Sequence, residues 1–140
     1  MNLHNLNIAV LGAGRSGRAA ARLAMKHGGR VCVFDTSPAI TGWPEDIPLH
    51  AGATQEDWHA VRSDLVVISP VFETDCPFVK SFGREDVETI GEMELASRFY
   101  RGKIIAITGT NGKGSTSSLG EKIMLRGGRD ADAGGDCGVP

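Results

Sequence analysis

Short runs of β-forming residues alternate along the chain with segments whose apolar residues recur at helical spacing. Each run ends at glycine, aspartate or proline, which is typical of strands in a parallel sheet. Strands are expected at residues 7–11, 30–34, 64–69, 87–90 and 103–108. Helices are expected at 15–27, 55–62, 92–100 and 115–126, with irregular chain at 36–54 and at most one short helix in 73–86. The alternation predicts an α/β fold with a parallel sheet.

The first strand-to-helix connection is rich in glycine and reads GAGRSG at residues 12–17. In the pattern G-x-G-x-x-G, Gly12 permits the tight turn, Gly14 lets a phosphate approach the backbone, and Gly17 lets helix and strand pack closely. The start of a helix favours a diphosphate, and Asp35 closes the next strand, where an acid can accept hydrogen bonds from sugar hydroxyls. The loop does not distinguish NAD, FAD and UDP-sugars, and a tight turn without a ligand stays an alternative.

A second glycine loop, GTNGKGS at residues 109–115, follows the last apolar run. It departs from the P-loop pattern G-x-x-x-x-G-K-[ST], because its first glycine comes too early and Gly114 stands where a hydroxyl residue belongs. Its backbone N–H groups can still surround phosphate oxygens. Lys113 supplies charge for the β- and γ-phosphates, and Ser115 or Thr116 can hold Mg²⁺. The residues expected to bind ATP are Gly109, Thr110, Asn111, Gly112, Lys113, Gly114, Ser115 and Thr116.

Composition narrows the partners of the chain. Its 140 residues carry a net charge of −2, and acidic and basic residues are interspersed, which argues against nucleic acid and membrane surfaces. No apolar run approaches the ~20 residues of a membrane span, so a cytoplasmic protein is expected. Three widely spaced cysteines and four scattered histidines predict neither a disulfide framework nor a metal site built from side chains alone.

Both loops together resemble those of the Mur ligase family. The stretch ITGTNGK at 107–113 resembles the phosphate loop of Mur ligases and of folylpolyglutamate synthases. The order of the loops resembles the D-glutamate-adding Mur ligases, in which a UDP-binding domain precedes the ATPase domain. Other stretches that carry the resemblance are GAGRSG, Asp35-Thr36, Ser69-Pro70, GEMEL at 91–95 and GG-x-x-G-x-P ending at Pro140.

The resemblance implies that residues 1–101 form a Rossmann-like UDP-sugar-binding domain and that residues 102–140 begin a P-loop ATPase domain, as a strand, a phosphate loop and a helix. The implied reaction belongs to peptidoglycan precursor synthesis and adds D-glutamate to UDP-N-acetylmuramoyl-L-alanine through an acyl phosphate formed from ATP. Lys113 would be catalytic and Ser115 would bind Mg²⁺. The residues implied to bind the UDP-substrate are Gly12, Gly14, Arg15, Ser16, Gly17, Asp35, Thr36 and Asp136.

Because family members are much longer, this chain is expected to be a monomeric amino-terminal portion, inactive alone, with the D-glutamate site outside it. It departs from the family pattern at Val71, where a glycine usually follows Ser-Pro, at Gly114, and at Asp136-Cys137, where Asn-Ile is usual. Two other hypotheses stay open, an NAD-binding Rossmann protein with a coincidental second loop and a non-catalytic nucleotide-binding module. Titration with NADH and UDP-sugars distinguishes the NAD-binding protein from the ligase. The non-catalytic module predicts ligand binding without turnover.

Overall fold

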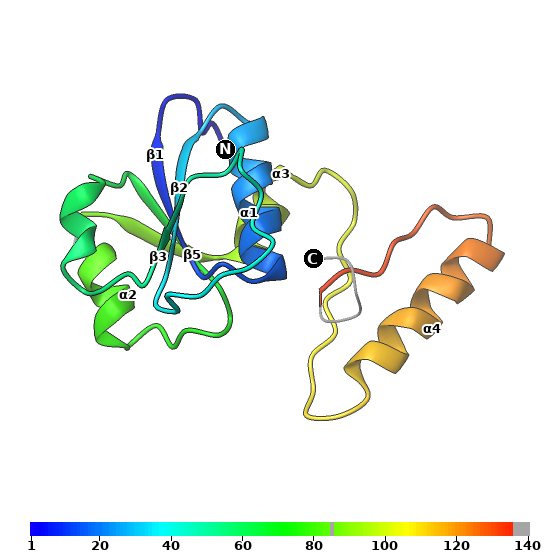
Figure 1. Cartoon of the computed structure of the whole chain (residues 1–140). Coiled ribbons are helices and arrows are strands. Elements are labelled where there is room, and N and C mark those ends of the chain that lie inside the picture. Colours follow the sequence, from blue (N-terminus) through cyan, green and yellow to red (C-terminus); the bar gives the residue numbers. More distant parts are fainter. Residues whose placement is uncertain (85, 136–140) are drawn as a thin grey trace. The chain divides into compact units, whose positions relative to one another are not determined.

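A five-stranded parallel sheet forms the centre of the first unit, Met1–Tyr100, in this computed structural model (Figure 1). The structure describes residues 1–84 and 86–135. The strands are β1 (Asn7–Leu11), β2 (Arg30–Asp35), β3 (Leu49–Ala51), β4 (Leu65–Ile68) and β5 (Glu88–Gly91). Their spatial order is β3-β2-β1-β4-β5. Because all five run in one direction, their carboxyl ends share one edge, and the chain order reverses there between β1 and β4.

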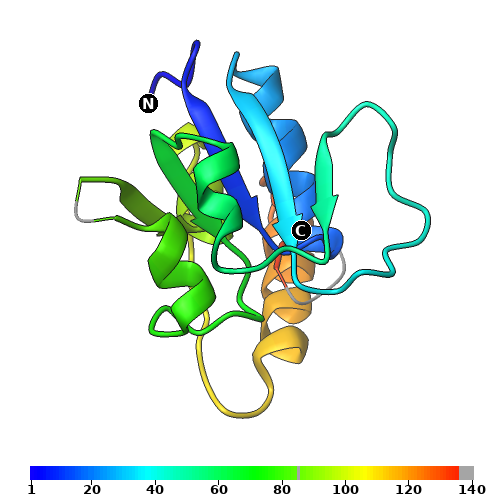
Figure 2. The same cartoon turned by 60° about the vertical axis from the view of Figure 1, so that its left-hand side comes forward.

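Helices cover both faces of this sheet (Figure 2). They are α1 (Arg15–Lys26) and α3 (Glu92–Phe99) on one face, and the 3₁₀ helix η1 (Asp57–Ala60) and α2 (Pro77–Phe82) on the other. The pleat of β1 sends alternate side chains to opposite faces. Ile8 and Val10 pack with α1, whereas Ala9 and Leu11 pack with the phenylalanines of α2. All four are completely buried, so this central strand positions the glycine loop that follows it.

Most elements expected in the first unit are confirmed, with end points that differ by one or two residues. One expectation is wrong, because residues 36–54 contain the short strand β3. Its register pairs Val33 with Leu49, and its three residues are at most half-buried. Such a segment has no hydrophobic period of its own, so only the neighbouring strand β2 makes it a strand.

The second unit begins at Arg101 and contains α4 (Lys113–Arg126). The strand expected at 103–108 is wrong, because these residues form no strand. A strand needs a neighbour for its backbone hydrogen bonds, and residues 101–135 contain no other strand to supply one. The helix starts two residues earlier than expected, directly after Gly112, whose φ of 79° is left-handed.

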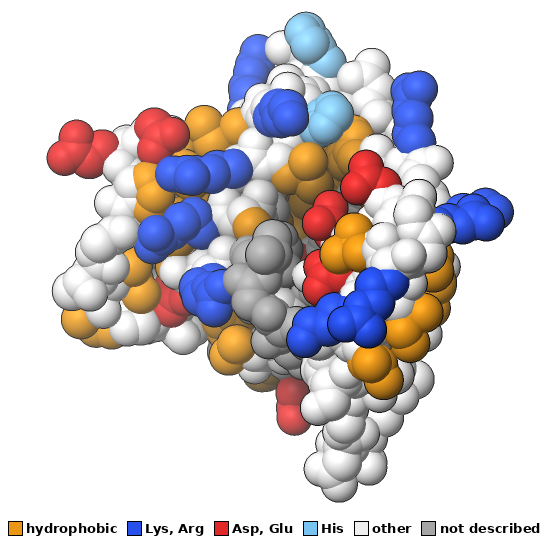
Figure 3. Space-filling view, turned by 90° about the vertical axis from the view of Figure 1, so that its right-hand side faces the viewer, with side chains coloured by type: hydrophobic (Ala, Val, Ile, Leu, Met, Phe, Trp, Pro, Cys, Tyr) orange, Lys and Arg blue, Asp and Glu red, His pale blue; other side chains and the backbone are white. Residues whose placement is uncertain are grey.

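Apolar side chains of the second unit lie open to solvent. Ile105 is 72% exposed, and Leu119 and Ile123 of α4 are 59% and 60% exposed. Figure 3 shows apolar side chains lying between charged ones on one face of the chain. The second unit therefore buries little of its own apolar surface.

In the described ranges, 1–84 and 86–135, no helix is both long enough and apolar enough to cross a membrane.

Hydrogen exchange should distinguish two apolar runs that were both expected to be strands, residues 64–69 and 103–108. We expect the backbone amides of 103–108 to exchange at nearly unprotected rates, because no ladder holds them. The amides of β4, which pairs with both β1 and β5, should exchange only on global unfolding. Mass spectrometry of exchanged peptic peptides makes this comparison within one sample. Strong protection at 103–108 would contradict the structure of this segment.

Candidate diphosphate-binding site

The glycine loop between β1 and α1 is shaped by close contacts at its two ends. Gly12 has a φ of +112°, and a Cβ there would lie 2.7 Å from the Cβ of Ser69. A Cβ on Gly17 would lie 1.9 Å from the carbonyl oxygen of Gly12. Around Gly14, by contrast, no described atom beyond its neighbours in the chain lies within 4 Å of a Cβ position. The loop is therefore tight at both ends and open in its middle, where a ligand can approach the backbone.

The start of α1 lies at this opening. Gly14 is the N-cap residue, which provides no side-chain hydrogen bond, and the first turn contains no acidic residue. The positive end of the helix dipole and the first backbone N–H groups favour an anion at such a place. Arg15 is exposed and Ser16 is half-buried in the same turn. This arrangement suits the diphosphate expected from the sequence.

Asp35 holds the loop from the neighbouring strand. The N–H of Ala13 donates to its Oδ2 at 2.7 Å, and the N–H of Ser37 donates to its Oδ1 at 2.8 Å. From the sequence, this carboxylate was expected to bind sugar hydroxyls. In the structure it also orders the loop, because each of its oxygens accepts a hydrogen bond from a backbone N–H. Each oxygen keeps a further lone pair for a ligand. Thr36 follows it and is exposed.

Two polar residues that follow β4 and β5 were missing from the expected site. Ser69 follows β4 and is only 3% exposed, and Glu92 is the first residue of α3. Burial raises the pKa of the Glu92 carboxyl, while hydrogen bonds from Ser16 and Ser69 act in the opposite direction. Both residues stand in stretches that carry the family resemblance, Ser69-Pro70 and GEMEL at 91–95, and both stretches follow a strand. These two signals could have found them.

Within the described residues, the second loop holds itself together. The ammonium of Lys113 donates to the carbonyl oxygen of Gly109 at 2.7 Å, and the exposed hydroxyls of Ser115 and Thr116 lie in the first turn of α4. Residues 1–84 and 86–135 contain no cluster of three or more His, Cys, Asp or Glu side chains suited to a metal. Asp136, expected near the UDP-substrate, lies outside the described residues.

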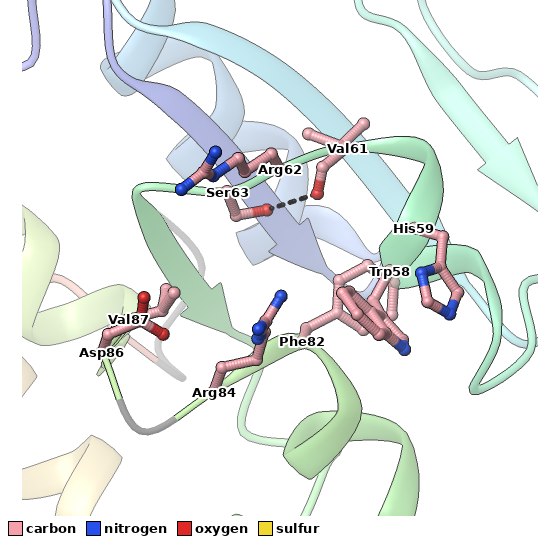
Figure 4. A pocket seen from close by; sticks show the side chains of 9 residues that line it. All are labelled: Trp58, His59, Val61, Arg62, Ser63, Phe82, Arg84, Asp86 and Val87. Carbon is pink, nitrogen blue, oxygen red and sulfur yellow. Dashed lines mark hydrogen bonds between the residues drawn. The ribbon is translucent and has the colours of Figure 1, made fainter.

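A hollow of about 400 Å³ lies at the opposite edge of the sheet (Figure 4). Arg62 precedes β4 and Val87 precedes β5, so the hollow sits at the amino ends of these strands. Figure 4 shows Arg84 between Asp86 and Trp58, and its guanidinium carbon lies 4.8 Å from the Trp58 ring centroid. The hollow is therefore separate from the glycine loop, which follows the carboxyl end of β1.

The parallel sheet and the glycine loop at its carboxyl edge define an α/β domain of the Rossmann type. A family model described as Mur ligase MurD-like, N-terminal domain, matches residues 6–91, which include every strand of the sheet. The chain belongs to the Mur ligase family, the ATP-dependent ligases of peptidoglycan precursor synthesis.

Individual relatives agree with this assignment. The UDP-N-acetylmuramoylalanine–D-glutamate ligase of Haemophilus influenzae (strain PittEE) is 32% identical over 139 residues, which cover 97% of this chain and 32% of the relative. The ligase of the same name from Acidobacterium capsulatum is 37% identical over 147 residues, covering 100% of this chain and 32% of the relative. This chain thus spans about a third of the length of these relatives.

A solved structure shows the same fold. It is the UDP-N-acetylmuramate:L-alanyl-gamma-D-glutamyl-meso-diaminopimelate ligase from Neisseria meningitides, with a TM-score of 0.60. The likeness covers 89% of this chain and 40% of that protein, at 18% sequence identity. At that identity the comparison concerns the fold alone.

Proposed function

We propose that residues 1–101 form the UDP-sugar-binding domain of a ligase that adds D-glutamate to UDP-N-acetylmuramoyl-L-alanine. The observation that carries this proposal is the glycine loop, which is open at Gly14 in front of an uncapped helix start. A diphosphate is the group that fits an uncapped helix start beside backbone without side chains. Family membership supplies the reason to choose a UDP-sugar over a nicotinamide dinucleotide.

The residues around the loop divide the work of binding. Backbone N–H groups at the start of α1 hold the diphosphate together with Arg15 and Ser16. Asp35 keeps the loop in shape through the N–H of Ala13 and, with Thr36, places the uridine. These roles need neither a nicotinamide nor a protein-bound metal ion in the first unit.

Residues 102–140 contribute the phosphate loop of the ATP site in the same proposal. The two left-handed or extended glycines, Gly109 and Gly112, leave the loop backbone open to phosphate oxygens, and the Lys113 ammonium already lies against that loop. These residues fit a nucleoside triphosphate, with Ser115 or Thr116 holding Mg²⁺, which neutralises phosphate charge when bound. Lys113 would exchange its bond to a carbonyl for one to phosphate oxygen.

The reaction that this arrangement serves is carboxylate activation. The γ-phosphoryl group of ATP is transferred to the carboxylate of the UDP-substrate, which gives an acyl phosphate and ADP. The amine of D-glutamate then attacks the acyl carbon and displaces phosphate, so that an amide forms. Lys113 stabilises the negative charge on the transferred group. The D-glutamate site lies outside this chain in the proposal, so this chain alone binds without turnover.

A parallel titration of the 140-residue chain with UDP-N-acetylmuramoyl-L-alanine, NADH and Mg-ATP tests the proposal. The Trp58→Phe variant is used because it leaves Trp43 as the single tryptophan. The Arg18 guanidinium carbon lies 5.3 Å from the Trp43 ring centroid, so this fluorophore reports on α1. We expect saturable binding of the UDP-sugar that NADH does not displace. Tight NADH binding with indifference to the UDP-sugar would favour an NAD-linked protein instead.

A further inference from the structure

Glu92 joins the three segments that surround the glycine loop. It begins α3, and interactions with Ser16, in the first turn of α1, and with Ser69, after β4, both act to lower the pKa of its carboxyl. Its Oε1 lies 3.7 Å from the position that a Cβ on Gly17 would take. The carboxyl therefore stands behind the first turn of α1, whose front is the opening at Gly14.

One oxygen of this carboxyl is buried without compensation. Among the residues that the structure describes, Oε1 of Glu92 makes no hydrogen bond. A buried carboxylate oxygen without a partner favours the protonated form of the group. Burial is accordingly the largest influence on the Glu92 pKa and raises it, against the smaller effect of the two serines.

The charged groups on the elements packed against α3 do not contribute to the pKa shift of this carboxyl, which comes from burial and the two serines. Strand β4 has no titratable residue, and β5 contributes Glu88, which pairs with Arg98 of α3 at 2.6 Å together with Glu94. The basic residues of α1 are Arg15, Arg18, Arg22 and Lys26. None of these groups is among the causes of the Glu92 pKa shift.

A diphosphate at the start of α1 would face this carboxyl across a single helical turn. An ionised Glu92 and the diphosphate would both be attracted to the positive end of α1 and would repel each other. A protonated carboxyl removes the repulsion. It also keeps its hydrogen bonds, since serine hydroxyls both donate and accept.

We propose that Glu92 is a positioning residue of the diphosphate site, which holds Ser16 and Ser69 as a neutral carboxyl once the ligand is bound. Binding of the UDP-sugar then takes up one proton at Glu92. The inference rests on the proposed function, because it requires an anionic ligand at the glycine loop.

The test is the Kd of UDP-N-acetylmuramoyl-L-alanine for the whole chain between about pH 5 and pH 8, a range that lies above the ordinary carboxyl pKa. A ligand that raises the Glu92 pKa binds fully below the pKa of the free chain and loses affinity as pH rises toward that of the complex. We therefore expect Kd to rise with pH by up to tenfold per unit in the wild type. In Glu92→Gln this component should vanish, because the amide is always neutral.

Controls separate this effect from other titrations and from a structural role. Glu94→Gln removes a carboxylate of the same helix that pairs with Arg98, and it should keep the wild-type slope. The four histidines are common to all variants, so they cancel in the comparison. Glu92→Ala should bind weakly at every pH because it loses both serine contacts, and only Gln should rescue binding.

A carboxyl-carbon NMR titration of the wild type follows Glu92 without any substitution. We expect its pKa to be higher in the complex than in the free chain. Equal pH slopes in wild type and Glu92→Gln, or an unchanged carboxyl pKa on binding, would overturn the inference while leaving UDP-sugar binding intact. If the wild type bound no UDP-sugar at any pH, the proposed function would fail and the inference with it.

Discussion

Gly17→Ala is expected to lower the free energy of unfolding by about 3 kcal/mol, a large fraction of the roughly 5–15 kcal/mol that is typical of a whole domain. The added Cβ would lie 1.9 Å from the carbonyl oxygen of Gly12. Neither group is the end of a flexible side chain, so α1 must move away from β1. Urea denaturation followed by circular dichroism measures the loss, and an unchanged midpoint would show that the helix does not approach the strand so closely.

Gly14→Ala is the matched control within the same loop. Its Cβ would meet no atom within 4 Å, and its φ of −74° is open to alanine. We expect stability to stay within about 0.5 kcal/mol of the wild type. The methyl group would nonetheless occupy the space in which a phosphate approaches the backbone, so UDP-sugar affinity should fall. Together the two variants separate the packing role of one glycine from the binding role of the other.

Asp35→Ala should affect both stability and binding. It removes the acceptor for two backbone N–H groups, those of Ala13 and Ser37, at 2.7 and 2.8 Å. Hydrogen bonds to a charged group contribute more than neutral ones, so we expect a loss of about 2 kcal/mol in the free energy of unfolding. Because Ala13 lies inside the glycine loop, UDP-sugar affinity should fall at least about tenfold, equivalent to roughly 1.4 kcal/mol. Calorimetric titration and urea denaturation give the two quantities.

Asp64→Ala provides the comparison at the other edge of the sheet. The N–H of Asn7, the first residue of β1, donates to its Oδ2 at 2.8 Å, at the end of the strand away from the glycine loop. This variant should lose stability while its affinity for the UDP-sugar stays at the wild-type value. If both variants lost affinity equally, the effect of Asp35 would reflect general destabilisation and its proposed role would be wrong.

The two site residues that the sequence did not predict, Ser69 and Glu92, show the limit of local sequence patterns. The glycine loop was predictable because its conformational demands fall on glycines within six consecutive positions. Ser69 and Glu92 are separated from that loop by more than fifty residues, and nothing in their own stretches says which strand is their neighbour. They come close to the loop because β4 pairs with β1 and β5 pairs with β4. Their contribution could be recognised only after the strand order was known.

The α/β class, four strands of the first unit and the conformation of the first glycine loop follow from local patterns, because hydrophobic periodicity and glycine act within a few residues. Tertiary structure decided which segments with weak or ambiguous patterns became strands. Leu49–Ala51 is a strand because β2 offers it hydrogen-bond partners, whereas 103–108 is strongly apolar and finds no such partner within residues 101–135. It also decided the surroundings of Glu92, since burial and partners depend on contacts that arise only when distant segments pack together.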